Sequence, residues 1–132
     1  MNIHILAQYQ SIRKEIIEIK DRINQIRYNA MHPTCPQITD MPRASGYSND
    51  GMVRIVIQIE ELTELYMAKQ IELNDLCIEI EKEIAGLESL ERRIIRLRYF
   101  EGLTWEEIGN TVDYSTAQLN RIHRKILEKL QR

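Results

Sequence analysis

Glycine and proline are scarce in this sequence, with 5 and 3 residues among 132. So few turn-forming residues argue against an all-β sandwich, which is rich in tight turns. No apolar run approaches the ~18–20 residues that a membrane-spanning helix needs. The first residues also lack the basic region and compact apolar core of a secretory signal. We therefore expect a cytoplasmic protein that makes no membrane contact.

Cysteine is nearly absent too, and in a cytosolic chain we expect Cys35 and Cys77 to be free thiols. His32 and Cys35 form a lone H-x-x-C pair, whereas a zinc site normally needs four ligands. Paired carboxylates in a plausible cleft, a Gly-rich phosphate loop and a nucleophile motif are all missing. We therefore expect no metal, no cofactor and no enzymatic activity.

A surplus of basic charge is missing from the whole chain, which has 18 basic and 20 acidic residues. That balance speaks against a nucleic-acid binder, but it hides an uneven distribution. Residues 1–88 hold 9 basic and 14 acidic residues, whereas residues 89–132 hold 9 basic and 6 acidic ones. Residues 115–132 alone hold five basic residues and one acid. This asymmetry points to a C-terminal end that faces nucleic acid.

The first two-thirds of the chain contain many isoleucine residues at heptad spacing. Two stretches, residues 2–29 and 52–85, each place apolar side chains alternately four and three residues apart, which predicts long helices that need a partner helix. The first stripe consists of Ile5, Tyr9, Ile12, Ile16, Ile19, Ile23 and Ile26. The second, with one polar interruption, consists of Ile55, Ile59, Leu62, Tyr66, Lys69, Leu73, Leu76 and Ile80. A partial second stripe that widens this apolar face consists of Val56, Ile71 and Ile78.

The segment between these helices, residues 30–51, holds all three prolines and is predicted to be a loop. It is long enough to let the two helices pack antiparallel in one chain, and pairing between chains fits the pattern equally well. Residues 1–86 are thus predicted to form a helical hairpin or coiled coil that supports a homodimer or higher homo-oligomer. A second domain, residues 87–132, follows the helix-weakening Gly86.

The C-terminal domain is predicted to hold three helices. The first begins after an N-cap at Ser89 and ends near Glu101 and Gly102. The other two each open on a capping box, Thr104–Glu107 and Ser115–Gln118, around a short helix and a tight turn. This arrangement describes a helix-turn-helix. Its inward residues are predicted to be Trp105, Ile108, Val112, Leu119, Ile122, Ile126 and Leu130.

The last helix then has the composition of a major-groove reader, because Gln and Asn can bond adenine and Arg can bond guanine. The predicted base-facing residues are Thr116, Ala117, Gln118, Asn120, Arg121 and Arg124. The predicted phosphate contacts are Ser115, Lys125, Lys129, Arg92 and Arg93. His123 is expected to face solvent or phosphate. The simpler alternative is a basic helix whose outer face is only solvated.

Residues 89–130 resemble region 4 of the sigma-70 family, above all in the stretch LRYFEGLTWEEIG from Leu97 to Gly109. In its organisation the whole chain resembles the ArpU/RinA-type late-gene transcriptional regulators of phages. These resemblances imply an all-α protein that binds double-stranded DNA in a bacterial cytoplasm, with RNA polymerase as a further candidate partner.

Three functions follow as hypotheses. The first is a phage or prophage sequence-specific regulator, expected to be a late-gene activator. The second is a small terminase-type subunit that recognises DNA for packaging, and a ring of many copies would favour it. The third is a protein that binds RNA polymerase or a sigma factor without touching DNA.

Overall fold

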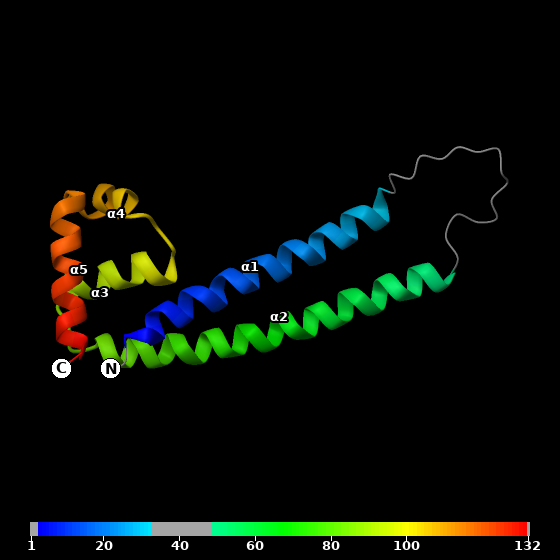
Figure 1. The fold of residues 1–132 in the computed structure, drawn as a ribbon, viewed down its shortest axis with the longest axis horizontal. Helices are drawn as coiled ribbons and strands as arrows, with labels where there is room; N and C mark the ends of the chain where they lie inside the picture. Colours follow the sequence, from blue (N-terminus) through cyan, green and yellow to red (C-terminus); the bar gives the residue numbers. More distant parts are fainter. Residues whose placement is uncertain (1–2, 33–48, 132) are drawn as a thin grey trace. The chain divides into compact units, whose positions relative to one another are not determined.

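The computed structural model describes residues 3–32 and 49–131, and every regular element in these two ranges is helical. The elements are α1 (His4–Met31), α2 (Asn49–Ile84), α3 (Ser89–Ile95), the π-helix η1 (Arg96–Phe100), α4 (Trp105–Val112) and α5 (Thr116–Gln131), as Figure 1 shows. The all-α prediction is confirmed. Most of the predicted loop 30–51 lies outside the described residues, as does Cys35. None of the described helices is long and apolar enough to cross a membrane.

The chain divides into two compact units, one of Met1–Lys14 with Ile71–Arg132 and one of Glu15–Gln70. Each long helix contributes residues to both units. The predicted domain boundary after residue 86 stays a prediction.

In the unit Glu15–Gln70, parts of α1 and α2 pack antiparallel within one chain. Lys69 Nζ lies 3.1 Å from Glu15 Oε2, while near the other end of this unit Ile26 and Gln58 line a common groove. Ile16 and Ile23 of the predicted stripe are buried. Lys69, the polar interruption of the second stripe, is thus the partner of Glu15. The half-exposed pair contributes no more than about 1 kcal/mol.

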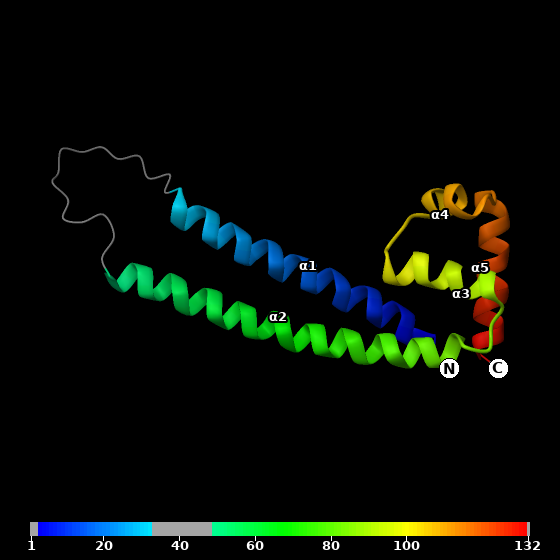
Figure 2. The same ribbon diagram turned by 180° about the vertical axis from the view of Figure 1, so that it is seen from behind.

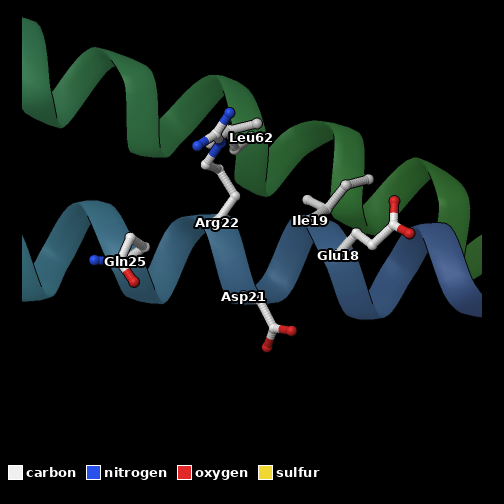
Figure 3. Close-up of a pocket in the computed structure, with 6 residues that line it drawn as sticks. All are labelled: Glu18, Ile19, Asp21, Arg22, Gln25 and Leu62. Atoms are coloured by element: carbon white, nitrogen blue, oxygen red, sulfur yellow. The ribbon is translucent and has the colours of Figure 1, made fainter.

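A groove of about 560 Å³ runs along this pair of helices (Figure 3). Ile19 and Arg22 reach towards Leu62 of α2, whereas Asp21 of the same helix points away from it. Ile19 and Asp21 follow the pattern of a heptad seam, in which apolar side chains face the partner and charged ones face solvent, whereas the charged Arg22 extends along the partner helix. No group of side chains converges in this groove to hold a ligand.

The partial second stripe of α2 does not widen the buried face. Val56, Ile71 and Ile78 are 49%, 64% and 56% exposed. Ile71 and Ile78 lie on the side of α2 opposite the buried seam and Val56 lies beside it, and all three are exposed, so the expectation that they extend the packed face is wrong. They are apolar side chains in contact with solvent.

The other unit carries the principal core of the described residues. Ile80 and Ile84 of α2, Ile94 and Ile95 of α3, and Ile108, Leu119 and Ile126 of the last two helices are fully buried. Burial of one such side chain contributes roughly 1.5–3 kcal/mol. The end of α2 is therefore part of the core on which α3, α4 and α5 assemble (Figure 2).

The first helix of the C-terminal region differs from its prediction in its N-cap and in the geometry of its last turn. Its N-cap is Glu88 rather than Ser89, and the Glu88 N–H donates to Glu91 Oε1 at 3.0 Å. After Ile95 the helix widens into η1, where the Glu101 N–H donates to the Arg96 carbonyl at 3.0 Å. The helix ends at Glu101 and Gly102 as predicted, and Gly102 has a φ of 71°.

Candidate nucleic-acid interface

The turn between α4 and α5 is built on two close backbone approaches. Thr104 caps α4, accepting a hydrogen bond from the Glu107 N–H at 3.2 Å, so the predicted N-cap is confirmed. Only half of the predicted capping box is formed, because Glu107 Oε1 accepts from the Thr104 hydroxyl at 3.0 Å rather than from the Thr104 N–H. At the other end Asp113 adopts a left-handed conformation with φ 61°, and the Tyr114 N–H donates to the Gly109 carbonyl at 3.2 Å. A Cβ on Gly109 would lie 2.6 Å from the Tyr114 carbonyl oxygen. The turn therefore needs glycine at this position.

The second predicted capping box, at the start of α5, is confirmed. The Gln118 N–H donates to Ser115 Oγ at 3.1 Å, and the Ser115 N–H donates to Gln118 Oε1 at 2.9 Å. The Gln118 carboxamide oxygen is therefore already engaged in holding the first turn of the helix. Its amide nitrogen and the second lone pair of its oxygen remain available to a ligand while the cap is closed.

Helix α5 has one buried and one exposed face. Leu119, Ile126 and Leu130 are buried, and Ile122 is half-buried, as the inward pattern predicts. All the predicted base-facing residues are exposed, namely Thr116, Ala117, Gln118, Asn120, Arg121 and Arg124. In the described part of the chain, Arg121, Arg124 and Lys125 form no ion pair. Because α5 is an amphipathic helix of 16 residues, this polar face is continuous over several turns.

Of the five predicted phosphate contacts, Ser115 is exposed and its hydroxyl caps α5. The other four fall into two groups. Lys125 and Arg93 are exposed. Lys129 Nζ instead lies 2.7 Å from Oε2 of Glu91, whose side chain is only 10% exposed, and Arg92 donates to the Leu87 carbonyl. Burial raises the pKa of Glu91, but the hydrogen bonds from Lys129 and from the Glu88 N–H, together with the charge of Lys129, outweigh burial and lower that pKa. The hydrogen bond to Glu91 raises the pKa of Lys129. Lys129 and Arg92 therefore have structural partners within the domain.

A cluster behind the exposed face was missed from the sequence. The Tyr99 hydroxyl lies 2.8 Å from His123 Nε2, the Trp105 ring meets the His123 ring edge-on at 4.8 Å, and the Arg98 guanidinium lies 4.7 Å over Trp105. Burial, with a smaller contribution from Arg98, lowers the pKa of His123. The expectation that His123 faces solvent or phosphate is thus wrong. A sequence signal existed, because Leu119, His123, Ile126 and Leu130 repeat the 4,3,4 spacing of a buried stripe.

Comparisons of the sequence with known proteins point to the same kind of domain. Residues 84–132 match the family model of sigma-70, region 4. The chain is also 28% identical over 85 residues to the RNA polymerase sigma-D factor of Bacillus subtilis (strain 168), a stretch that covers 64% of this chain and 34% of that protein. The chain thus spans about a third of that relative's length. No solved structure matches the chain.

The resemblance to region 4 that Leu97–Gly109 carries is therefore confirmed, and the matching range begins inside the last turn of α2. The C-terminal region is a helix-turn-helix of the kind found in DNA-binding regulators, a regulatory rather than a catalytic kind of domain. The resemblance to phage late-gene regulators stays a prediction. So do the individual base and phosphate contacts.

Proposed function

We propose that this protein is a sequence-specific DNA-binding transcriptional regulator of a phage or prophage, acting in the cytoplasm of a bacterial host as a late-gene activator. The observation that carries the proposal is the exposed polar and basic face of α5, which begins at a closed capping box in a region that matches sigma-70 region 4. In a helix-turn-helix this second helix enters the major groove, and its first turns meet the base edges.

The proposed roles of the exposed side chains follow from their chemical type and from the hydrogen bonds that they already form. Arg121 and Arg124 carry guanidinium forks that suit guanine, and Asn120 carries an amide that suits adenine. Lys125 and Arg93 are exposed cations suited to phosphates on either side of the groove. Gln118 contributes its amide nitrogen, because its oxygen accepts from Ser115.

The direct test is selection of bound duplexes from a random pool, followed by affinity measurements on the selected site. Replacing Arg121 with Ala is expected to weaken binding by about 1–3 kcal/mol and to relax the preference at one base pair. Arg27→Ala removes the same charge from an exposed position of α1 and serves as the control. Equal affinity of Arg121→Ala and the intact chain would remove the assignment of α5 as the reading helix.

The helices of residues 1–86 are proposed to assemble copies of the chain or to contact RNA polymerase. Solvent-exposed apolar side chains on α2 support a partner of some kind, including Val53, Val56 and Met67, which are 55%, 49% and 59% exposed. Light scattering on the full chain, free and bound to a selected duplex, decides the stoichiometry. A dimer fits a regulator that binds two half-sites, whereas a ring of many copies fits the DNA-packaging subunit instead.

A second candidate function is binding to RNA polymerase without DNA contact. This function is favoured because Lys129 pairs with Glu91 and Arg92 donates to the Leu87 carbonyl. Both contacts leave fewer cations for phosphate. The similarity to a protein named as an RNA polymerase sigma factor also supports it. Failure to retain any duplex at ~50 mM salt, where phosphate attraction is strong, would favour this function over the first.

A further inference from the structure

A cavity of about 220 Å³ lies beside η1, away from the capping boxes of the helix-turn-helix. Its lining residues come from the first half of α1 and from the end of η1, and they are Gln10, Arg13, Lys14, Arg98, Tyr99 and Gly102. All six belong to the same compact unit. The volume is several times the ~30 Å³ share of one water molecule in the liquid, so a small polar group fits.

Three cations line this cavity, and neutral groups hold two of them. Arg13 Nη2 donates to the Glu101 carbonyl at 3.3 Å, and Arg98 Nη1 donates to the Leu103 carbonyl at 3.0 Å. Lys14 is exposed. Within residues 3–32 and 49–131, none of these three cations forms an ion pair. The positive charge at this cavity is therefore not neutralised by a carboxylate.

Two other cations of the same chain form ion pairs with carboxylates. Arg96 makes a two-pronged pair with Glu81 at 2.8 Å, and Lys129 pairs with Glu91 at 2.7 Å. Both of these cations are thus paired with a carboxylate of the same chain. Several like charges around one cavity repel one another, and an anion that binds between them removes that repulsion.

The surrounding contacts hold the cluster in place before any ligand arrives. Gln10 Nε2 donates to the Arg98 carbonyl at 3.4 Å, and the Tyr9 and Phe100 rings pack at 4.8 Å. Gly102, with φ 71°, brings its backbone so near that a Cβ there would lie 2.6 Å from Arg13 Nη1. Two of the three cations, Arg13 and Arg98, are thus ordered in advance, which reduces the entropy that the site loses when it binds a ligand.

We propose that this cavity binds a phosphate group, held by Arg13 and Lys14 of α1 together with Arg98 of the helix-turn-helix region. The phosphate comes either from a DNA backbone, so that the DNA footprint extends onto α1, or from a small phosphorylated molecule. The first source rests on the proposed function, and the second does not.

The first arm of the test measures duplex affinity against salt concentration. Lys14→Ala removes an exposed cation that makes no described hydrogen bond, and Ala favours the helix. Lys20→Ala is the matched control, because it removes an exposed lysine from the same helix. If DNA phosphate occupies the cavity, Lys14→Ala reduces the slope of log K against log salt by about 1, and Lys20→Ala leaves the slope unchanged.

The second arm titrates pyrophosphate into the full chain without DNA and follows the backbone amide resonance of Gly102. A saturable shift that Lys14→Ala abolishes and Lys20→Ala retains, combined with unchanged salt slopes, identifies a small phosphorylated ligand. Unchanged slopes and no saturable shift together overturn the proposal.

The two proposals can fail separately. If Arg121→Ala weakens binding while Lys14→Ala changes neither slope nor shift, the cavity proposal fails and the regulator stands. If the intact chain binds no duplex, the regulator fails and the pyrophosphate titration alone judges the cavity.

Discussion

The Tyr99 hydroxyl and His123 Nε2 lie 2.8 Å apart, and this contact joins η1 to the middle of α5. Replacing Tyr99 with Phe removes the hydroxyl and leaves a largely buried imidazole nitrogen without its partner. An unsatisfied buried polar group costs about 1–3 kcal/mol. We expect the free energy of unfolding of Tyr99→Phe to fall by that amount in a urea titration. Tyr28→Phe, at an exposed position of α1, is the control and should leave it unchanged.

His123 also predicts how stability depends on pH. Burial lowers its pKa in the folded state below the ~6.5 of an unfolded chain. The unfolded state therefore binds more protons as pH falls below about 6.5, so stability is full above that pH and is lost as pH decreases towards the folded-state pKa. The loss is at most about 1.4 kcal/mol per pH unit. Urea midpoints at pH 7.5 and 5.5 measure it, and His123→Gln should flatten the dependence. An equal decline in both proteins contradicts the prediction.

Gly109 and Gly86 form a natural pair of test positions. A Cβ at Gly109 would lie 2.6 Å from the Tyr114 carbonyl oxygen, whereas a Cβ at Gly86 would meet nothing within 4 Å. Gly109→Ala is therefore expected to reduce stability by about 1–3 kcal/mol through overpacking of the turn. Gly86→Ala should be neutral or slightly stabilising, because Ala restricts the unfolded chain. Thermal unfolding of both variants checks the contrast, and equal melting temperatures would refute it.

Lys129 and Lys125 separate structural from DNA-binding roles. Lys129 pairs with the largely buried Glu91, while Lys125 is exposed and unpaired in the described part of the chain. Lys129→Ala should lower stability, because it leaves the largely buried Glu91 carboxylate without its partner. Lys125→Ala should leave stability unchanged and reduce the salt slope of duplex binding by about 1. A stability loss in Lys125→Ala, or none in Lys129→Ala, would reverse these assignments.

Much of the fold followed from local patterns in the sequence. The heptad spacing of isoleucine predicted both long helices, and the two capping boxes placed the starts of α4 and α5. These features depend on neighbours three or four residues away, so one sequence contains all the information they need. The exposure of the predicted base-facing residues followed from the same periodicity.

Contacts between distant residues could not be predicted in this way. Glu91 and Lys129 are 38 residues apart, and Gln10 and Arg98 are 88 apart, so only the folded chain shows that each pair meets. The widening of the helix at η1 also has no pattern of its own in Arg96–Phe100, because a π-turn is rare and depends on the surrounding packing. These unforeseen contacts define the candidate phosphate cavity and the engagement of Lys129.

The closed cap at the start of α5 has a consequence for selectivity. Gln118 Oε1 holds the Ser115 N–H, and the Gln118 N–H holds Ser115 Oγ. A ligand that displaces the Ser115 N–H from the carboxamide oxygen opens one half of this pair and leaves a backbone N–H at the helix start without a partner, unless the ligand or water replaces it. A net hydrogen bond is worth only about 0.5–1.5 kcal/mol, so a weak competitor gains nothing by the exchange. A ligand must therefore gain more free energy than this hydrogen bond contributes before Gln118 changes partners.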